Sequence, residues 1–174
     1  MQVIEEVKNL YRIIKLTPFR KTDGVVFDLF PIDTLPHISS VDRVIHDSNA
    51  SSPGPVEGVP FTWYMHPHQA DNLMVLHGKR DVYLYTRVHG KVEHFTVYPD
   101  KIYRNGELVH EGGCILVWPC NVFHRIQSGE EGSGSINFAV HSKGFDIQTN
   151  FNIYDLDTET GEVKLLREGY KDQF

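Results

Sequence analysis

The first fifteen residues carry apolar side chains at the spacing of an α-helix. Four of them fall on one face of such a helix: Val3, Val7, Leu10 and Ile14. The opposite face carries the charged residues Glu5, Glu6 and Lys8. This amphipathic pattern predicts a short helix over residues 3–14. It would end before Pro18, because the residue that precedes a proline disfavours helical dihedral angles.

After Gly24 the pattern changes to short apolar runs that are separated by polar turns. The runs between residues 60 and 141 are rich in Val, Ile, Tyr, Phe and Thr: FTWYMHPH, NLMVLHG, DVYLYTRV, VEHFTVY, ILVW, HRIQS and SINFAVH. These residue types favour strands. Asn105-Gly106 is a strong signal for a tight hairpin. The runs FNIYDL and VKLLRE around DTETGE predict a further hairpin near the C-terminus.

Strand patterns of this number and spacing predict an all-β fold, a closed antiparallel sandwich or barrel. We expect a single domain over residues 1–174. Its parts would be a barrel core over about 58–141, an N-terminal helix and strand extension over 1–57, and a C-terminal hairpin over 149–168. The loop at 48–59, rich in Ser, Pro and Gly, is too short to mark a domain boundary.

The charge of the chain argues against nucleic acid as a partner. Its 174 residues carry a net charge of −6 with a pI near 5.9, and Lys and Arg form no run. A protein that binds nucleic acid through the phosphates presents clustered basic residues. We therefore expect a small-molecule substrate.

Insertion into a membrane and secretion are not indicated either. No apolar stretch approaches the roughly 18 residues that a membrane-spanning helix needs. The start, MQVIEEVKNL, lacks the basic-then-apolar order of a secretory signal. Cys114 and Cys120 lie in one short apolar segment, where a disulfide would pinch a small loop across a strand, so we expect reduced thiols. These features indicate a cytoplasmic protein.

Three histidines are the candidate chemistry of the chain. His66 and His68 are two residues apart, and alternate side chains of an extended strand leave the same face. Two imidazoles that point the same way are a common start to a transition-metal site. A third histidine, His124, follows GGCILVWPCNVF far downstream. We expect the three side chains to meet.

Two segments around these histidines resemble the two short motifs of the cupin superfamily. The first motif is two His separated by one residue, then an acidic residue, then an apolar strand that ends in Gly: His66-Pro67-His68, Asp71, NLMVLH and Gly78. The second is Gly, five residues, Pro, a turn and His: Gly113, CILVW, Pro119, residues 120–123 and His124. The resemblance covers residues 58–141. It implies a double-stranded β-helix, a small jelly-roll barrel, with the three histidines as metal ligands in its mouth.

The resemblance also implies an acidic ligand, and here the chain departs from the family pattern. Asp71 is shorter than the usual Glu and lies closer to the histidine pair, and Asn72 follows it. We therefore expect either Asp71 as the fourth ligand, Asn72 in its place, or a site of three histidines. Tyr64 shares a strand face with His66 and His68, which makes its hydroxyl a candidate catalytic group.

Imidazole and carboxylate ligands with open positions suit a divalent transition metal: Fe, Ni, Mn, Zn or Cu. Such an ion polarises a carbonyl group as a Lewis acid, or binds O₂ beside a chelating substrate. We expect a metal-dependent enzyme of the dioxygenase or isomerase type that acts on a small polar molecule.

Two other functions stay open at this point. NLMVLHGKRDVYLYT is similar to the strand–turn–strand of the cupin-fold epimerases and ketoisomerases that act on nucleotide-linked deoxysugars. Those enzymes generally work without metal, and His66 or His68 would be the base and Tyr64 the acid. The other function is a non-catalytic cupin that binds a small ligand. For each function we expect a homodimer, because a small jelly roll leaves strand edges exposed.

Overall fold

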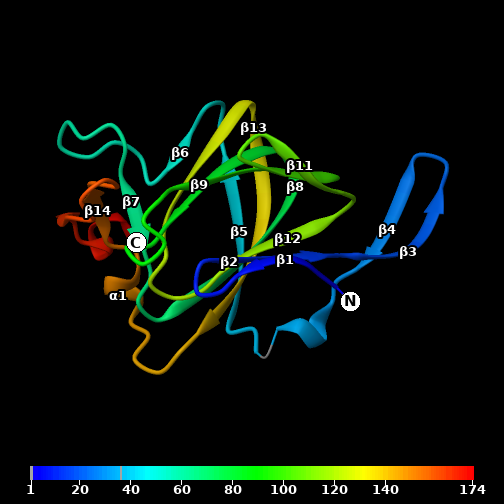
Figure 1. The fold of residues 1–174 in the computed structure, drawn as a ribbon, viewed down its shortest axis with the longest axis horizontal. Helices are drawn as coiled ribbons and strands as arrows, with labels where there is room; N and C mark the ends of the chain where they lie inside the picture. Colours follow the sequence, from blue (N-terminus) through cyan, green and yellow to red (C-terminus); the bar gives the residue numbers. More distant parts are fainter. Residues whose placement is uncertain (1, 36) are drawn as a thin grey trace.

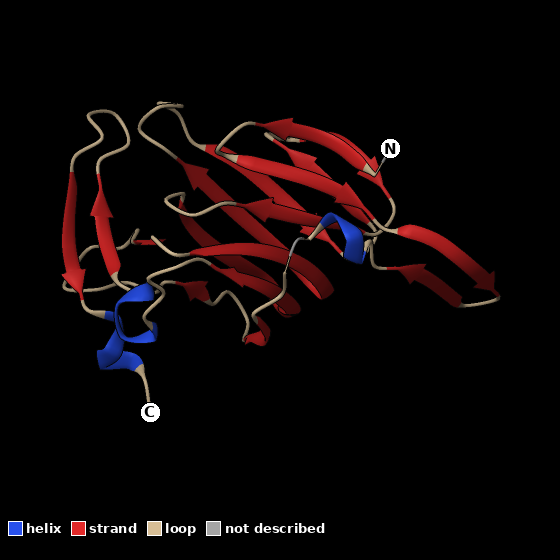
Figure 2. Cartoon of the chain, turned by 90° about the horizontal axis from the view of Figure 1, so that it is seen from below, coloured by secondary structure: helices blue, strands red, loops and turns tan. Residues whose placement is uncertain are grey.

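The structure, a computed structural model, describes residues 2–35 and 37–174, and strands make up most of it (Figure 2). One sheet contains 13 antiparallel strands, and a second, separate sheet contains two. Two long strands run through the middle of the large sheet: β8 (Gln69–Tyr85) and β13 (Phe123–His141). The prediction of an all-β double-stranded β-helix is confirmed.

β8 and β13 pair with each other over almost their whole length, from Tyr85 with Phe123 to Gln69 with His141. Their register shifts between Ser128 and Ser133, where both strands bend at the top of the molecule (Figure 1). Gly78 lies in this bend with a φ of 68°, and a Cβ atom there would lie 2.1 Å from the Gly132 carbonyl oxygen. Glycine is therefore required where the two strands bend and close the sheet around the core.

The N-terminal segment is a β-hairpin, so the predicted helix over residues 3–14 is wrong. β1 (Val3–Val7) pairs with β2 (Tyr11–Lys15), and β2 continues into the large sheet by pairing with β12 (Cys114–Trp118). Asn9 occupies the turn with a φ of 62°, a left-handed conformation that breaks a helix and that Asn tolerates. Pairing with β12 buries Ile13 completely, and this tertiary burial outweighs the local helical spacing.

The remaining strands of the barrel flank the two long ones. On the β13 side lie β5 (Ser40–His46), β6 (Ser51–Ser52) and β7 (Trp63–Met65). On the β8 side lie β9 (Glu93–Tyr98), β10 (Lys101–Arg104) and β11 (Glu107–Glu111). Asn105 and Gly106 form the turn between β10 and β11, both with positive φ, which confirms the tight hairpin predicted there.

The C-terminal part extends the sheet next to β7. Helix α1 (Ile147–Asn150) leads into β14 (Ile153–Leu156), which pairs with β7 on one side and with β15 (Val163–Arg167) on the other. The short helix η2 (Gly169–Asp172) follows. A hairpin is thus present where the sequence pattern predicts one.

The two-stranded sheet projects from the barrel at the right of Figure 1. It consists of β3 (Thr17–Thr22) and β4 (Val25–Leu29), and the short helix η1 (Ile32–Thr34) follows it. Five of its apolar side chains are about half exposed or more: Phe19, Val25, Val26, Phe27 and Leu29. We call this element the β3–β4 arm.

The main hydrophobic core lies between the β2–β12–β8 layer and the β9–β10 strands. Its largest fully buried members are aromatic and aliphatic side chains from five strands and the first turn: Leu10, Tyr11, Ile13, Leu73, Leu84, Phe95, Ile102 and Leu116. Within the described residues, no helix is both long and apolar enough to cross a bilayer.

Candidate functional site

A cavity of about 210 Å³ lies inside the barrel. Its walls come from β5, β6, β7, β8, β12 and β13, and His66 and Phe151 contribute from the segments after β7 and α1. Four of the predicted site residues line it: Tyr64, His66, Asp71 and His124. This is the place at which the two sequence motifs meet.

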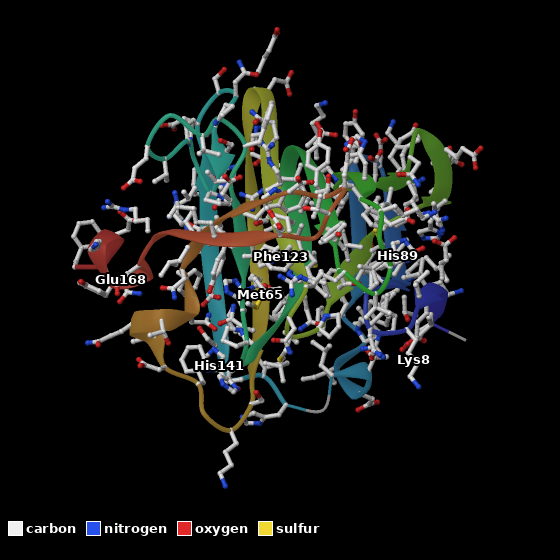
Figure 3. All side chains as sticks on the ribbon, turned by 60° about the vertical axis from the view of Figure 1, so that its left-hand side comes forward. Lys8, Met65, His89, Phe123, His141 and Glu168 are labelled. Carbon is white, nitrogen blue, oxygen red and sulfur yellow. The ribbon has the colours of Figure 1, made fainter. Side chains whose placement is uncertain are left out.

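His66, Asp71 and His124 converge in this cavity, and each is almost fully buried. His66 follows β7 directly, Asp71 lies near the start of β8, and His124 lies near the start of β13. The register pair of Met65 and Phe123, which precede the two histidines in the chain, marks this place in Figure 3. The Asp71 Oδ2 atom lies 3.5 Å from His66 Nε2 and 3.8 Å from His124 Nε2. We call these three residues the His66–Asp71–His124 triad.

Hydrogen bonds orient both imidazoles of the triad. The Nδ1 atom of His66 contacts the carbonyl oxygen of Asn150, and that of His124 contacts the carbonyl oxygen of Val122 at 3.1 Å. A carbonyl oxygen only accepts, so Nδ1 carries the proton and donates in each ring. In a neutral imidazole this leaves the Nε2 lone pair free, and both Nε2 lone pairs face Asp71.

The Asp71 carboxylate is held by one oxygen only. Oδ1 accepts hydrogen bonds from Gln69 Nε2 at 2.7 Å and from Asn137 Nδ2 at 2.8 Å. Oδ2 is buried and has no hydrogen-bond partner within residues 2–35 and 37–174. It points at the two Nε2 atoms, so three electron-rich atoms face one another.

The environment keeps His124 neutral. Burial first, and then the neighbouring His66, lower the pKa of His124 to about 4, although Asp71 opposes the shift. At neutral pH its Nε2 therefore offers a lone pair. Two imidazole nitrogens and one carboxylate oxygen within 4.8 Å of one another fit a divalent transition-metal ion in both ligand type and spacing.

His68 lies outside this group. β7 ends at Met65 and β8 begins at Gln69, so the chain bends between them and the alternation of an extended strand does not apply. His68 is half-buried, with its Nδ1 atom 3.4 Å from Ser142 Oγ. The expectation that His66 and His68 point the same way is thus not met.

Asn72 also lies outside the group. It is the neighbour of Asp71 on a strand, so its side chain leaves the opposite face. Its Nδ2 atom donates to the carbonyl oxygen of Phe138 at 2.7 Å. Asp71 is thus the residue of this pair that faces the cavity.

Tyr64 lies beside the triad, as its position in the chain suggests. Its ring centroid is 6.0 Å from those of both His66 and His124. Burial raises the pKa of Tyr64, so the hydroxyl keeps its proton and is a hydrogen-bond donor at neutral pH. The ring of Phe151 packs against His66 with 4.9 Å between centroids, and Trp118 packs against His124 at 5.2 Å.

Gln69 links the triad to a fourth histidine. Besides holding Asp71, its Oε1 atom lies 3.2 Å from His141 Nε2 and accepts a hydrogen bond from Asn150 Nδ2. His141 stands at the end of β13, below Phe123 in Figure 3. It contacts Gln69 and does not line the cavity.

Several cavity residues have no signal in the sequence motifs. Arg80, His46 and Ser135 line the same space as the triad. Arg80 lies in the run Lys79-Arg80-Asp81, which reads as a polar turn, whereas β8 continues through it. The burial of Arg80 could have been predicted only from the alternation of inward-facing and outward-facing side chains along one long strand.

The comparisons with known proteins concern the fold. No protein-family model matches the chain, and no curated protein matches its sequence. The sugar 3,4-ketoisomerase QdtA from Thermoanaerobacterium thermosaccharolyticum, in complex with TDP, is similar with a TM-score of 0.53 and 14% identity, over 81% of this chain and 85% of that chain. A double mutant of QdtA with TDP has a TM-score of 0.52 and 17% identity over the same shares. These likenesses and the strand topology identify this chain as a protein with the cupin fold, the double-stranded β-helix that it shares with QdtA.

Proposed function

We propose that this chain is a metal-dependent cupin enzyme of the dioxygenase or isomerase type. In this proposal His66, Asp71 and His124 hold a divalent transition-metal ion, and a small polar molecule binds beside it in the cavity. One observation carries the proposal: three buried acceptor atoms converge, and Asp71 Oδ2 has no donor within the described residues. Such a cluster is costly unless a cation lies between its members.

The types of the three ligand residues narrow the range of reactions that the bound metal could support. Two histidines and one carboxylate with open positions are typical of non-haem Fe(II) oxygenases. A bound ion of this kind supplies Lewis-acid polarisation or a centre for O₂ chemistry. Fe is therefore the first ion to test, followed by Mn, Ni, Zn and Cu.

Other residues of the chain have defined parts in the proposal. Gln69 and Asn137 hold the Asp71 carboxylate in place through Oδ1. Tyr64 keeps its proton and donates a hydrogen bond to an oxygen of the bound molecule. Phe151 and Trp118 pack against the two imidazoles and exclude water from them.

Elemental analysis of tag-free protein tests the metal site. We expect close to one transition-metal ion per chain, or uptake of one ion from an Fe(II) or Mn(II) titration, and loss of this binding in His66→Ala and in His124→Ala. His68→Ala is the matched control, because it removes an imidazole from the same segment but outside the triad. Wild-type protein that neither contains nor takes up metal would contradict the proposal. An oxygen-consumption screen and an isomerase screen of the loaded protein then separate the two reaction types.

A metal-free ketoisomerase is the second candidate, and one observation favours it. The same triad would accommodate a proton on one Nε2 atom in place of a metal ion, and the ring of Tyr64, the candidate acid, lies 6.0 Å from that of His66. A cavity of about 210 Å³ is smaller than drug-sized pockets, so the nucleotide of a nucleotide-linked sugar would lie outside it.

Thermal-shift assays with TDP and TDP-linked sugars test this candidate. Stabilisation by the TDP-linked sugar, in protein that takes up no metal, would favour the isomerase. Ligand binding without turnover in either screen would favour the third function, a cupin that only binds a small molecule. Each outcome selects one function, because the three differ in metal content or in product formation.

We also propose a homodimer in which the β3–β4 arm packs on a second copy. The arm presents Phe19 and Phe27 to solvent at 66% and 50% exposure, and contiguous exposed apolar surface of this kind is typical of interaction sites. We expect a dimer mass in light scattering at micromolar concentration and a monomer mass for the double variant Phe19→Asp/Phe27→Asp. Val88→Asp is the control, because Val88 is an exposed apolar residue outside the arm. A monomeric wild type would contradict the dimer.

The expected cytoplasmic location remains part of the proposal. Cys114 and Cys120 form no disulfide in the structure, which supports a reducing compartment. Burial raises the pKa of the Cys114 thiol to about 12, so this thiol stays protonated and unreactive. Both thiols should react with a maleimide when freshly isolated protein is denatured without reductant.

A further inference from the structure

Arg80 is a buried cation in the same cavity as the triad. It lies on β8 at 1% exposure, and its side chain lines the cavity. Burial lowers the pKa of its guanidinium to about 10, so Arg80 keeps its charge at neutral pH. No carboxylate lies within 4.0 Å of it among the described residues. A buried charge without a counter-ion is unusual, because buried charges are normally paired.

Neutral groups fix the guanidinium in place. Its Nε atom donates to Ser133 Oγ at 2.9 Å, and Nη2 donates to the carbonyl oxygen of Val44 at 3.1 Å. Ser133 Oγ is in turn 2.6 Å from Ser128 Oγ, which lies 3.0 Å from His46 Nδ1. Burial and the charge of Arg80 lower the pKa of His46 to about 4, so this histidine is neutral at physiological pH. The network therefore orients Arg80 without neutralising it.

The guanidinium has more N–H donors than the described residues use. Arginine carries five N–H groups, and the protein takes one from Nε and one from Nη2. Both N–H groups of Nη1 and one of Nη2 remain free of protein acceptors in the described part of the chain. These two nitrogens form the edge of the planar fork that binds a carboxylate through two parallel hydrogen bonds.

Ser135 is an independent sign of a ligand at this place. It lies on β13 at 2% exposure and lines the cavity. Its Oγ atom is buried and has no hydrogen-bond partner within the described chain. A buried hydroxyl is normally satisfied, so a second unpaired group beside the Arg80 cavity points to an acceptor that comes from a bound molecule.

The strand register places Arg80 at a distance from the triad, whereas Ser135 lies two residues before Asn137, which donates to Asp71. His124, Ile126 and Ser128 alternate on the inward face of β13, and Ser128 is the register partner of Arg80. Four residues of strand span about 13 Å, so the backbone positions of His124 and Ser128 are about that far apart. Ile126, Leu73 and Val44 line the cavity as well and provide an apolar stretch.

We propose that Arg80 and Ser135 form a carboxylate-binding subsite, and that the ligand of this cavity is a small organic monocarboxylate whose other end faces the His66–Asp71–His124 triad. The carboxylate accepts from the free Nη1 and Nη2 edge of Arg80 and from the Ser135 hydroxyl. An apolar middle portion of the ligand lies against Ile126 and Leu73. The subsite rests on the proposed function, because it names the substrate class of that function and lies in the same cavity. Binding of a carboxylate at the subsite requires no metal.

Binding of matched probes to metal-free, EDTA-treated protein tests the subsite. Acetate, pyruvate and benzoate are each titrated against the corresponding neutral amide, with inorganic phosphate as a further anion. We expect at least one carboxylate to bind about tenfold or more tightly than its amide. We also expect it to shift the side-chain Nε–H signal of Arg80 in the wild-type ¹⁵N spectrum.

Variants assign this selectivity to Arg80. Arg80→Met should abolish the preference for the carboxylate over the amide, and Ser135→Ala should reduce it a few-fold. Arg125→Met is the matched control, since Arg125 is also a buried arginine. It lies on β13, stacks on the Phe61 ring and does not line the cavity. It should leave the preference unchanged.

Three results would overturn the subsite. These are equal binding of every carboxylate and its amide, an Arg80 Nε–H signal that no carboxylate moves, and a response to phosphate alone. The signal in wild-type protein decides the matter even where Arg80→Met does not fold. The metal content of Arg80→Met is measured in parallel and should equal that of the wild type. Carboxylate selectivity in a protein that never binds metal would contradict the metal site and support the subsite.

Discussion

At the His124 end of the cavity the converging atoms are acceptors, whereas at the Arg80 end the unpaired groups are donors. His66 Nε2, His124 Nε2 and Asp71 Oδ2 face one another, and no described residue places a proton donor between them. Arg80 and Ser135 offer N–H and O–H groups without acceptors in the described chain. Both groups are buried, so bulk water compensates neither.

The contrast distinguishes a binding cavity from a polar core. A core that contained the same side chains for structural reasons would pair the donors with the acceptors, because unpaired buried polar groups reduce stability. Here Arg80 and Asp71 lie on one strand, β8, and line one cavity, yet they form no ion pair. The separation is what a cation at one end and a ligand anion at the other would require.

The largest expected effect follows from removing the negative charge at the acceptor end. Asp71→Asn keeps the size of the side chain and the acceptor of Gln69 and Asn137, but it replaces Oδ2 by an amide donor. We expect the affinity for Fe(II) or Mn(II) to fall by about 100-fold or more. In EDTA the same variant should be more stable than wild type by about 1 kcal/mol, because the amide donates to an Nε2 atom.

Calorimetric metal titration and urea unfolding in EDTA measure the two effects. Asn72→Ala is the control for the titration, because Asn72 lies on the opposite strand face. Unchanged metal affinity in Asp71→Asn would show that Oδ2 is no ligand. A large loss of stability in EDTA would show that the carboxylate is already paired in the metal-free protein.

The donor end should respond to pH through His46. Its pKa is about 4 in the folded protein, against the ordinary value of 6.5 that applies to the unfolded chain. Between these values the unfolded state binds the proton more tightly. Stability is therefore complete above pH 6.5 and falls as the pH drops toward 4, by up to about 1.4 kcal/mol per pH unit.

An NMR titration of His46 and urea unfolding across this pH range provide the check. In Arg80→Met the pKa of His46 should rise, because the charge of Arg80 contributes to its depression. A wild-type His46 that titrates near pH 6.5 would show that the charged guanidinium of Arg80 does not lie beside it. Arg80 would then not be a charged donor at this end of the cavity.

The smallest effect is expected at His68. The structure places it beside Ser142 and outside the triad. His68→Ala should change the affinity for Fe(II) or Mn(II) by less than about twofold, which lies within the error of a calorimetric titration. A loss comparable to that of His66→Ala would show that the segment between β7 and β8 rearranges to bring His68 to the metal.

The sequence predicted the strands and the meeting of distant motifs because both depend on local patterns. The spacing from Gly113 through Pro119 to His124 placed this histidine against the first motif, and the structure brings His124 together with His66 and Asp71. The predicted orientation of His68 was wrong, because side chains alternate regularly only along a continuous strand and the chain bends at Pro67.

Other features depend on tertiary contacts that no local pattern contains. The N-terminal segment has helical spacing, but pairing of β2 with β12 decides its structure. Arg80 sits between two charged residues, Lys79 and Asp81, that pair with each other at 2.9 Å, so the run has the composition of a surface turn. Its burial becomes visible only when β13 supplies Ser133 and β5 supplies the carbonyl oxygen of Val44.

A crystal structure of protein loaded with Mn(II) or Fe(II) tests the central claim most directly, through the anomalous scattering of the ion. We predict one strong anomalous peak within bonding distance of His66 Nε2, His124 Nε2 and Asp71 Oδ2. His68 should lie outside its coordination shell. A loaded crystal without a peak between these three atoms, or with the ion bound elsewhere on the chain, would contradict the account.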